Sequence, residues 1–493
     1  MKYKTQAILI GLFMITVAVR LLLAFSIPEF TYDSYFHLRQ VEHIRETGLP
    51  LYHDLLSYGG RDFRFLPFFH YFMAFFSLFL PLSLVAKIIP NILVASLTIT
   101  SYLISKKITK NETASLLSAM IAGFLPVLFS TNSFTVDTLS LPLTFFVIYS
   151  FFRIKEQNYL YAYIISFLIL SVTSSSAFFV IIGFAIYALL SALEGKKMPR
   201  SEIEVMIFSL FFFLWVQFMF FKNSLLQEGI SFIWGNTPSR IISAYFPSVS
   251  IAQALLLVSI IPFMAGVLVA YRSLFELKGQ KSFLLISFVI STTLLTWLRL
   301  IKFRQSLAFF AVILAILFAL FYLDLERYYK KTRLARYQRY VLPSLVVLLL
   351  ISTAIPAINA SLRQDVPTVE EVEAFKWLRD NTPANATVLA TLHEGHLVAY
   401  YGQRKNLMDD QFILISDVDK RFSDLSVLFT THFQTQAISL ADQYGLRYLV
   451  LTPSAKENYD LPRLHYISSA CFDLIYKNET KIYRTKCELA GAE

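Results

Sequence analysis

Long apolar stretches recur along most of the chain, separated by short polar segments. Each stretch is close to the length that a helix needs to cross the hydrocarbon core of a bilayer, which is roughly 20 residues. The pattern therefore predicts a helical membrane protein that crosses the bilayer many times. The candidate spans are 6–26, 67–86, 88–105, 113–130, 137–153, 159–173, 175–193, 204–222, 250–271, 281–298, 303–323 and 339–358.

A polar island interrupts this pattern near the start of the chain. Residues 31–64 read TYDSYFHLRQVEHIRETGLPLYHDLLSYGGRDFR and contain many charged and histidine side chains. A chain this apolar can place such a segment only in water at the membrane surface. We therefore predict a large external loop, 27–87, within a transmembrane domain that covers 1–362.

From about residue 363 the composition becomes that of a soluble domain. The sequence predicts a helix over VEEVEAFKWLRDN, a strand at TVLAT, helices that end at Gly445, a buried strand at LRYLVLTP and a terminal hairpin over FDLIYKNETKIYR. This alternation indicates a small α/β unit over 363–493.

The distribution of basic residues predicts the orientation of the chain in the membrane. If 67–86 lies in the outer surface or re-enters from it, the basic clusters at 106–110, 153–155, 196–200, 272–281 and 327–339 fall on the side of Lys2 and Lys4, as the positive-inside rule requires. We therefore expect about 11 spans, with 12 or 13 as alternatives. The amino terminus is then cytoplasmic and the carboxyl-terminal domain extracytoplasmic, in a multi-pass protein of the cell membrane.

Composition narrows the class. The chain is 56% hydrophobic and 16% charged, which excludes a soluble globular protein. Its net charge of +10 comes from clusters between apolar runs, so nucleic acid is not an expected partner. The only two cysteines, Cys471 and Cys487, are equidistant from Glu479 at the hairpin tip, and the sequence leaves open whether they form a disulfide.

Two carboxylates are candidates for chemistry on the outer face. Asp33 follows the first apolar run, and Asp137 stands where a later helix re-enters the bilayer. Two converging carboxylates can hold a divalent cation through oxygen ligands. The alternatives are helix capping for both, or a pairing of Asp33 with the buried Arg20.

A third candidate group is the basic cluster Arg299, Lys302 and Arg304 between two late spans. Three outward cations in six residues run against the positive-inside rule. They indicate an anionic ligand at that depth, such as a lipid phosphate. The alternative is that they anchor helices at the interface.

Three segments together resemble a known family. DSYFHLRQVEHI, GFLPVLFSTNSFTVDTLSLPLTFF and EAFKWLRDNTPANATVLATLHEGHLVAYYGQRKNLMDD are similar, in this order, to motifs of oligosaccharyltransferase catalytic subunits, especially archaeal ones. Those are C-type (GT-C), polyprenyl-dependent membrane glycosyltransferases. The resemblance implies transfer of a sugar or glycan from a dolichyl or other polyprenyl phosphate or diphosphate to an asparagine amide on the outer face.

The resemblance also implies roles for residues. Asp33 and Asp137 would be catalytic and would bind Mg²⁺ or Mn²⁺. Arg304 would lie near the arginine that contacts the donor phosphates, with Arg299 and Lys302 beside it. His37 and Arg39, within the first motif, are assigned to substrate binding. A single-chain enzyme of this type needs no obligate subunit.

The sequence departs from the family pattern at three places. Leu139 replaces a second acidic ligand, and loop 223–249 offers Glu228 as its only acid. Where the family reads Trp-Trp-Asp-Tyr-Gly, this chain reads Thr-Leu-His-Glu-Gly. His393, Glu394 and His396 are then acceptor contacts, metal ligands or a plain loop. The acceptor is a protein or a glycan; alternatives are a lipid or polysaccharide hydroxyl, a non-catalytic accessory relative, and a transporter.

Overall fold

The computed structural model describes residues 2–229, 250–277, 279–412 and 414–488 and divides into two compact units. The first unit comprises 1–27, 66–222 and 249–364, and the second comprises 28–65, 223–248 and 365–493. The boundary at 364–365 lies two residues from the one expected at 362–363. The external loop expected over 27–87 is divided instead, because 28–65 belongs to the second unit. Residues 230–249, within the loop that was expected to carry acidic groups, lie outside the described residues.

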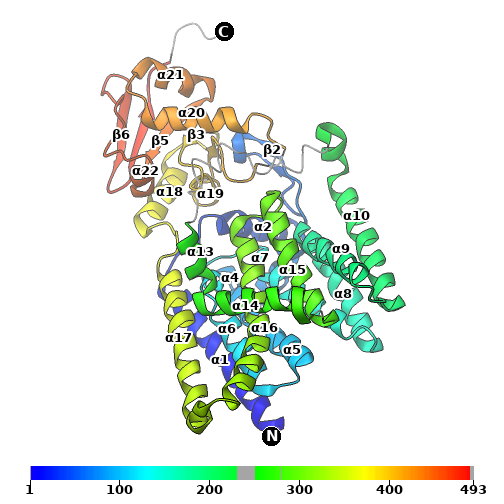
Figure 1. Cartoon of the computed structure of the whole chain (residues 1–493). Coiled ribbons are helices and arrows are strands. Elements are labelled where there is room, and N and C mark those ends of the chain that lie inside the picture. Colours follow the sequence, from blue (N-terminus) through cyan, green and yellow to red (C-terminus); the bar gives the residue numbers. More distant parts are fainter. Residues whose placement is uncertain (1, 230–249, 278, 413, 489–493) are drawn as a thin grey trace. The chain divides into compact units, whose positions relative to one another are not determined.

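The described part of the first unit consists of helices (Figure 1). Its α-helices are α1 (Lys2–Ser26), α3 (Phe68–Ser77), α4 (Leu82–Ala95), α5 (Leu97–Thr109), α6 (Glu112–Gly123), α7 (Asp137–Phe152), α8 (Gln157–Thr173), α9 (Phe178–Leu193), α10 (Arg200–Glu228), α13 (Ile251–Val258), α14 (Ile260–Arg272), α15 (Gln280–Trp297), α16 (Phe303–Lys330) and α17 (Gln338–Leu362). Short turns of 3-10 or π-helix occur at η2 (Pro126–Leu128), η3 (Ser175–Ala177), η5 (Ser273–Leu277) and η6 (Arg333–Tyr337).

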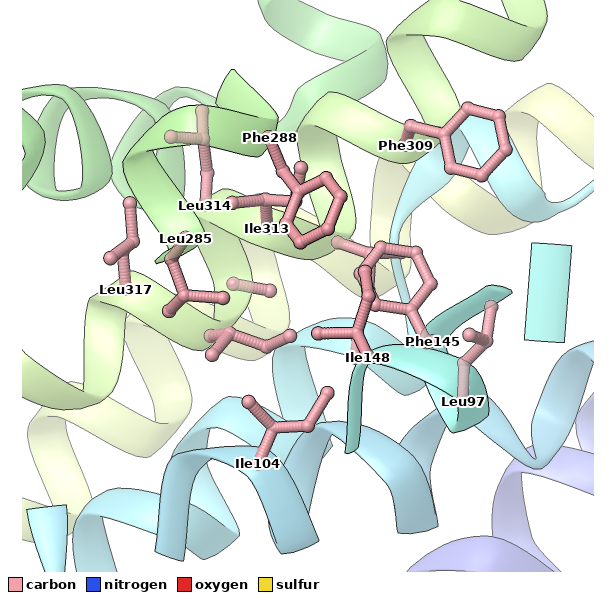
Figure 2. Close-up of a cluster of buried hydrophobic side chains, with 14 of the residues drawn as sticks. Leu97, Ile104, Phe145, Ile148, Leu285, Phe288, Phe309, Ile313, Leu314 and Leu317 are labelled. Atoms are coloured by element: carbon pink, nitrogen blue, oxygen red, sulfur yellow. The ribbon is translucent and has the colours of Figure 1, made fainter. Parts of the chain in front are cut away.

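The core of this unit surrounds α16, whose apolar window is 78% buried. A helix that is apolar on all sides must be covered on all sides, and α16 packs against α5, α6, α14 and α15. Figure 2 shows the centre of this cluster. Its labelled side chains come from α5, α7, α15 and α16: Leu97, Ile104, Phe145, Ile148, Leu285, Phe288, Phe309, Ile313, Leu314 and Leu317.

Six helices of the described chain are long and apolar enough to cross a membrane, or seven if a bent pair counts as one span. They are Tyr3–Ser26, Leu82–Thr109, Ser175–Leu193, Arg200–Leu226, Phe303–Lys330 and Tyr340–Leu362, with Ile251–Val258 and Ile260–Glu276 as the pair, bent by 90°. The multi-pass character is thus confirmed, whereas the count of about 11 is not.

The segment 67–86 does not form one helix. Helix α3 has ten residues and a length of ~15 Å, too short for a hydrocarbon core of roughly 30 Å. The chain breaks at 78–81, and Leu82 begins the spanning helix that continues to Thr109. The expected run 88–105 therefore starts six residues too late, because 82–86 belongs to that span.

The second unit combines the whole polar island with the carboxyl-terminal α/β domain. Its elements are α2 (Ser34–Thr47), β1 (His53–Asp54), η1 (Ser57–Gly59), β2 (Arg61–Asp62), α18 (Val369–Asn381), β3 (Thr387–Leu389), α19 (Gly395–Tyr400), β4 (Lys405–Asn406), α20 (Val418–Thr430), α21 (Gln434–Gln443), β5 (Leu446–Leu451), α22 (Pro453–Asn458), β6 (Phe472–Lys477) and β7 (Lys481–Thr485). The main sheet has the order β4-β3-β5-β7-β6. The expected strands, terminal hairpin and first helix are confirmed.

The hairpin closes with a disulfide. Cys471 precedes β6 and Cys487 follows β7, and their sulfurs are bonded with the Cα atoms 4.9 Å apart. The antiparallel pairing of Phe472 with Thr485 brings the two cysteines together. The pairing that the sequence left open is therefore present.

We predict that this disulfide stabilises the second unit. Replacing both cysteines by alanine should lower the free energy of unfolding by about 3 kcal/mol, because a closed loop of this size restricts the unfolded chain. Thermal unfolding of the purified full chain in detergent measures the change. A reductant should reproduce the loss in the native chain and leave the double variant unaffected; an equal response of both proteins would contradict the prediction.

Candidate functional site

Two predicted site segments meet inside the first unit. Gln305 donates from Nε2 to Asp137 Oδ1 at 2.6 Å, and Arg304 donates from its guanidinium to the hydroxyl of Ser130. We call these four residues the membrane-unit site. Arg304 is exposed and Asp137 is half-buried, so a ligand can reach both charges.

Helix geometry explains this meeting. Asp137 is the first residue of α7, where the positive end of the helix dipole favours a carboxylate. Arg304 and Gln305 lie in the first turn of α16, and consecutive helical residues project about 100° apart. One side chain therefore points to the loop that precedes α7, and the other points to the start of α7 itself.

A buried polar network holds the loop that carries Ser130. The amide of Asn91 donates to the Thr131 carbonyl at 2.7 Å, and that of Asn132 donates to the Ile27 carbonyl at 3.0 Å. The hydroxyls of Thr131 and Ser361 are 2.7 Å apart. Polar groups buried in an apolar bundle must find such partners, so the loop is fixed from three sides.

The remaining predicted cations lie beside this site in sequence. Arg299 and Lys302 are exposed in the turn between α15 and α16, and Arg299 has the left-handed φ of 56°. Three cations thus occupy the residues around the start of α16. Arg20 does not pair with Asp33, because it donates to the Asn91 side chain and the Leu128 carbonyl instead.

Among the described residues, no group of three or more His, Cys, Asp or Glu is arranged to hold a metal ion. Leu139, where the family has an acidic ligand, is buried and apolar. Asp137 offers one carboxylate whose Oδ1 already accepts from Gln305. Metal binding by Asp33 and Asp137 stays a prediction.

Asp33 belongs to the second unit. It directly precedes α2, but its side chain makes no capping bond, so the capping alternative is excluded. Its Oδ1 accepts from the Thr31 hydroxyl at 2.6 Å. The neighbouring Tyr32 donates to Glu371 at 3.1 Å, which ties this stretch to the start of α18.

The other predicted residues of the first motif have different surroundings. Arg39 makes a bidentate salt bridge with Asp54, at 2.6 and 2.8 Å. Burial acts to raise the pKa of Asp54, but Arg39 outweighs it and the pKa is lowered. His37 is half-buried next to the ring of Phe36. Substrate binding by His37 and Arg39 stays a prediction.

Charged groups from three segments gather around the motif at 393–396. We call Asp33, Asp365, His393, His396 and Asp410 the histidine cluster. His396 Nε2 lies 2.7 Å from Asp410 Oδ1, and both side chains are buried. Burial acts to lower the pKa of His396, but the Asp410 carboxylate outweighs it and the pKa is raised. The Asp410 carboxylate thus favours the protonated form of the His396 imidazole.

His393 behaves differently from His396. Burial lowers the pKa of His393, while the carboxylates of Asp410 and Asp365 oppose the shift. The pKa of Asp365 is raised by burial, and the Asp33 carboxylate adds to that shift. His393 is half-buried, so a neutral imidazole flanked by carboxylates is open to a ligand.

Glu394 does not face a ligand. It is fully buried and accepts from the Thr391 backbone N–H at 2.9 Å and from the Thr452 hydroxyl. Burial raises its pKa to about 7. Gly395 is needed for packing, since a Cβ there would lie 2.2 Å from the Met408 carbonyl oxygen. The expected acceptor contact by Glu394 stays a prediction, and its observed partners all belong to the protein.

Sequence reasoning missed several members of these sites. Ser130 and Gln305 are neutral and stand in apolar segments, where nothing in the sequence marks them. Asp365 and Asp410 are loop carboxylates without a local pattern. A search for charged residues directly after the last span would have found Asp365, whereas Asp410 lies ten residues beyond α19, after β4.

Comparisons with known proteins identify solved structures of similar architecture. No protein-family model matches the chain, and no curated protein matches it in sequence. Archaeal oligosaccharyltransferase AglB from Archaeoglobus fulgidus, in complex with an inhibitory peptide and a dolichol-phosphate, is similar at a TM-score of 0.70 and 15% identity, over 91% of this chain and 69% of that one. A structure of the Archaeoglobus fulgidus oligosaccharyltransferase complex with Zn and sulfate gives 0.64 and 16%, over 90% and 67%.

A second protein shares the architecture over its whole length. ArnT from Cupriavidus metallidurans, bound to undecaprenyl phosphate, is similar at a TM-score of 0.57 and 10% identity, over 98% of this chain and 97 to 99% of ArnT across two structures. Identities this low establish the fold. The resemblance drawn from the motifs is thus confirmed at that level: the chain has the GT-C fold of oligosaccharyltransferase and ArnT.

Proposed function

We propose that the chain is a membrane glycosyltransferase that takes a sugar or glycan from a polyprenyl phosphate or diphosphate. The membrane-unit site carries this proposal. It joins an exposed guanidinium, a hydroxyl and a carboxylate at the start of two apolar helices. Two structures with the same fold hold dolichol-phosphate and undecaprenyl phosphate, which supports a lipid phosphate as ligand here.

The chemistry of such a transfer suits these residues. When the sugar leaves its carrier, negative charge develops on the phosphate that remains on the lipid. Arg304 can bind two phosphate oxygens at once, because the guanidinium is planar and always charged. Arg299 and Lys302 add positive charge within the same turn. Fixed cations of this kind stabilise the departing phosphate without rearranging during the reaction.

The metal that the resemblance implies is Mg²⁺ or Mn²⁺, and Asp137 in the first unit and Asp33 in the second would each supply a carboxylate to it. Two carboxylates fit Mg²⁺, which takes few protein ligands and fills its shell with water and substrate phosphates. They do not fit a structural zinc site, which needs four protein ligands. The ion would supply a positive charge beside the donor phosphates.

The acceptor side lies in the histidine cluster. Protein N-glycosylation is the default that the resemblance implies, with His393 and His396 at the acceptor and Asp33 beside them. His393 contributes a half-buried imidazole, and His396 is held by Asp410.

The burial of Glu394 favours a second candidate, transfer to a hydroxyl of a lipid or polysaccharide. Glu394 lies in the segment that aligns with the family's Trp-Trp-Asp-Tyr-Gly motif. Its buried carboxylate already accepts from Thr391 and Thr452, which disfavours a hydrogen bond with the threonine hydroxyl of an acceptor peptide. A neutral imidazole near pH 7 is suited to take the proton of an attacking hydroxyl. His393 would be that base.

We predict that Arg304→Ala lowers transfer from a labelled polyprenyl-linked sugar, with Mn²⁺ present, by about 10- to 100-fold. The loss of a charge-assisted contact to phosphate is the reason. Initial rates with purified protein measure it. As a control, Arg200→Ala removes an exposed arginine of the same unit that lies outside the membrane-unit site, and it should leave the rate unchanged. Full transfer by Arg304→Ala, or by Asp33→Ala in the same assay, would contradict the mechanism.

We predict that an oligosaccharide hydroxyl is the better acceptor if the second candidate holds. Transfer to oligosaccharides should then exceed transfer to an Asn-Val-Thr peptide, and His393→Ala should slow it by about 100-fold without changing KM for the donor. His465→Ala, at an exposed histidine, serves as the control. A strict requirement for the threonine of the peptide would refute the hydroxyl candidate and support N-glycosylation.

We also propose that the second unit is extracytoplasmic, and labelling of single cysteines tests this. Both native cysteines are in the disulfide, so an introduced cysteine is the only free thiol. A membrane-impermeant maleimide on intact cells should label Glu373→Cys on α18, whereas Lys197→Cys between α9 and α10 should react only after permeabilisation. Both side chains are exposed. The reverse pattern would overturn the orientation.

A further inference from the structure

Helix α3 carries a row of phenylalanine rings on one face. The row, which we call the phenyl ladder, consists of Phe68, Phe72, Phe76, Phe75 and Phe79. Successive ring centroids are 6.3, 5.1, 5.5 and 5.4 Å apart in that order. Each ring thus contacts the next, and the ladder extends past the end of the helix.

The opposite face of α3 is buried in the first unit. Phe69 and Met73 are fully buried, whereas Phe75 is 56% and Phe79 is 71% exposed. Helical spacing accounts for this division, because the ladder positions fall on one side of the helix and the buried ones on the other. No Asp, Glu, Lys or Arg occurs between 65 and 86, and the exposed side chains of α3 are Tyr71 and Phe75, with Phe68, Phe72 and Phe76 half-buried.

Two observations separate this face from an ordinary lipid-facing surface. First, the exposed faces of the long helices α1 and α17 are mainly aliphatic, with residues such as Leu22 and Ile355, whereas α3, like α10, presents rings in mutual contact. Second, α3 is too short to span the bilayer, so its exposed face is a local apolar surface that does not extend across the membrane.

The inner face links α3 to the membrane-unit site. Phe69 packs against Phe134 with ring centroids 5.3 Å apart. Phe134 stands between Ser130 and Asp137, in the loop that faces Arg304. The platform is therefore fixed to the loop at which the donor phosphate is proposed to bind.

We infer that the phenyl ladder holds the isoprenoid chain of the polyprenyl phosphate donor. This inference rests on the proposed function. A branched, unsaturated chain gains close contacts along a row of rigid rings, and aromatic side chains supply large contact area at little cost in side-chain entropy. A phosphate at Arg304 and a chain along α3 would together select a polyprenyl carrier over a soluble sugar phosphate.

The first experiment compares donors of different chain length. The double variant Phe75→Ala/Phe79→Ala should raise KM about tenfold for a donor of dolichyl length and leave KM unchanged for a donor with two isoprenoid units. The variant Phe211→Ala/Phe218→Ala removes exposed rings from α10 and should affect neither donor. An equal change for long and short donors would overturn the inference while the glycosyltransferase function stands.

The second experiment needs no activity. A polyprenyl phosphate with a photoactivatable group in its chain is cross-linked to the full-length protein in nanodiscs, and the adduct is mapped by mass spectrometry. We expect the adduct within 68–80 and its loss in Phe75→Ala/Phe79→Ala. An adduct elsewhere, or one removed equally well by excess phospholipid, would overturn the ladder as a chain site. Cross-linking at α3 without transfer from any donor would refute the proposed function alone.

Discussion

The buried guanidinium of Arg20 is the constraint on which the first unit depends. It is 2% exposed, and its partners among the described residues are neutral: its Nε donates to Asn91 and its Nη1 donates to the Leu128 carbonyl at 2.8 Å. The ring of Phe129 lies 4.9 Å away. A charge inside an apolar bundle is tolerated only while such partners stay in place. The loop that begins at Leu128 is therefore held against α1 and α4, and with it Ser130 and Asp137.

Lys87 is a second buried cation whose hydrogen bonds fix the chain, here at the end of α1. Its ammonium donates to the Ala24 and Ile27 carbonyls at 3.0 and 2.6 Å, which lack partners inside the helix because α1 ends at Ser26. A cation is also favoured there by the negative end of the helix dipole. The chain therefore leaves the membrane helix at a defined point, six residues before Asp33. Two buried cations thus set the positions at which both predicted carboxylate segments begin.

Hydrophobic patterning predicted the elements of this chain well and their pairings poorly. Each of the eleven favoured apolar runs forms a helix or a helical pair, and the segment 67–86, marked by Pro67, His70 and Pro81, forms the short helix α3 and the first residues of the candidate span that begins at Leu82. The pairing of Gln305 with Asp137 could not be predicted, because an amide in an apolar run has no signal of its own. The burial of Glu394 could not be predicted for another reason. Its exposure depends on tertiary contacts such as that with Thr452, which is 58 residues away in the sequence.

The charges of the two candidate sites differ in sign, and this difference bears on what each can bind. Arg299, Lys302 and Arg304 outnumber the single carboxylate Asp137, so the start of α16 attracts an anion such as a phosphate. The histidine cluster has three carboxylates and two imidazoles, those of His393 and His396. An anionic group would be repelled there, whereas a neutral amide or hydroxyl would be accepted. The electrostatics of each unit, taken alone, are thus compatible with the proposed phosphorylated donor at the first unit and the proposed uncharged acceptor at the second.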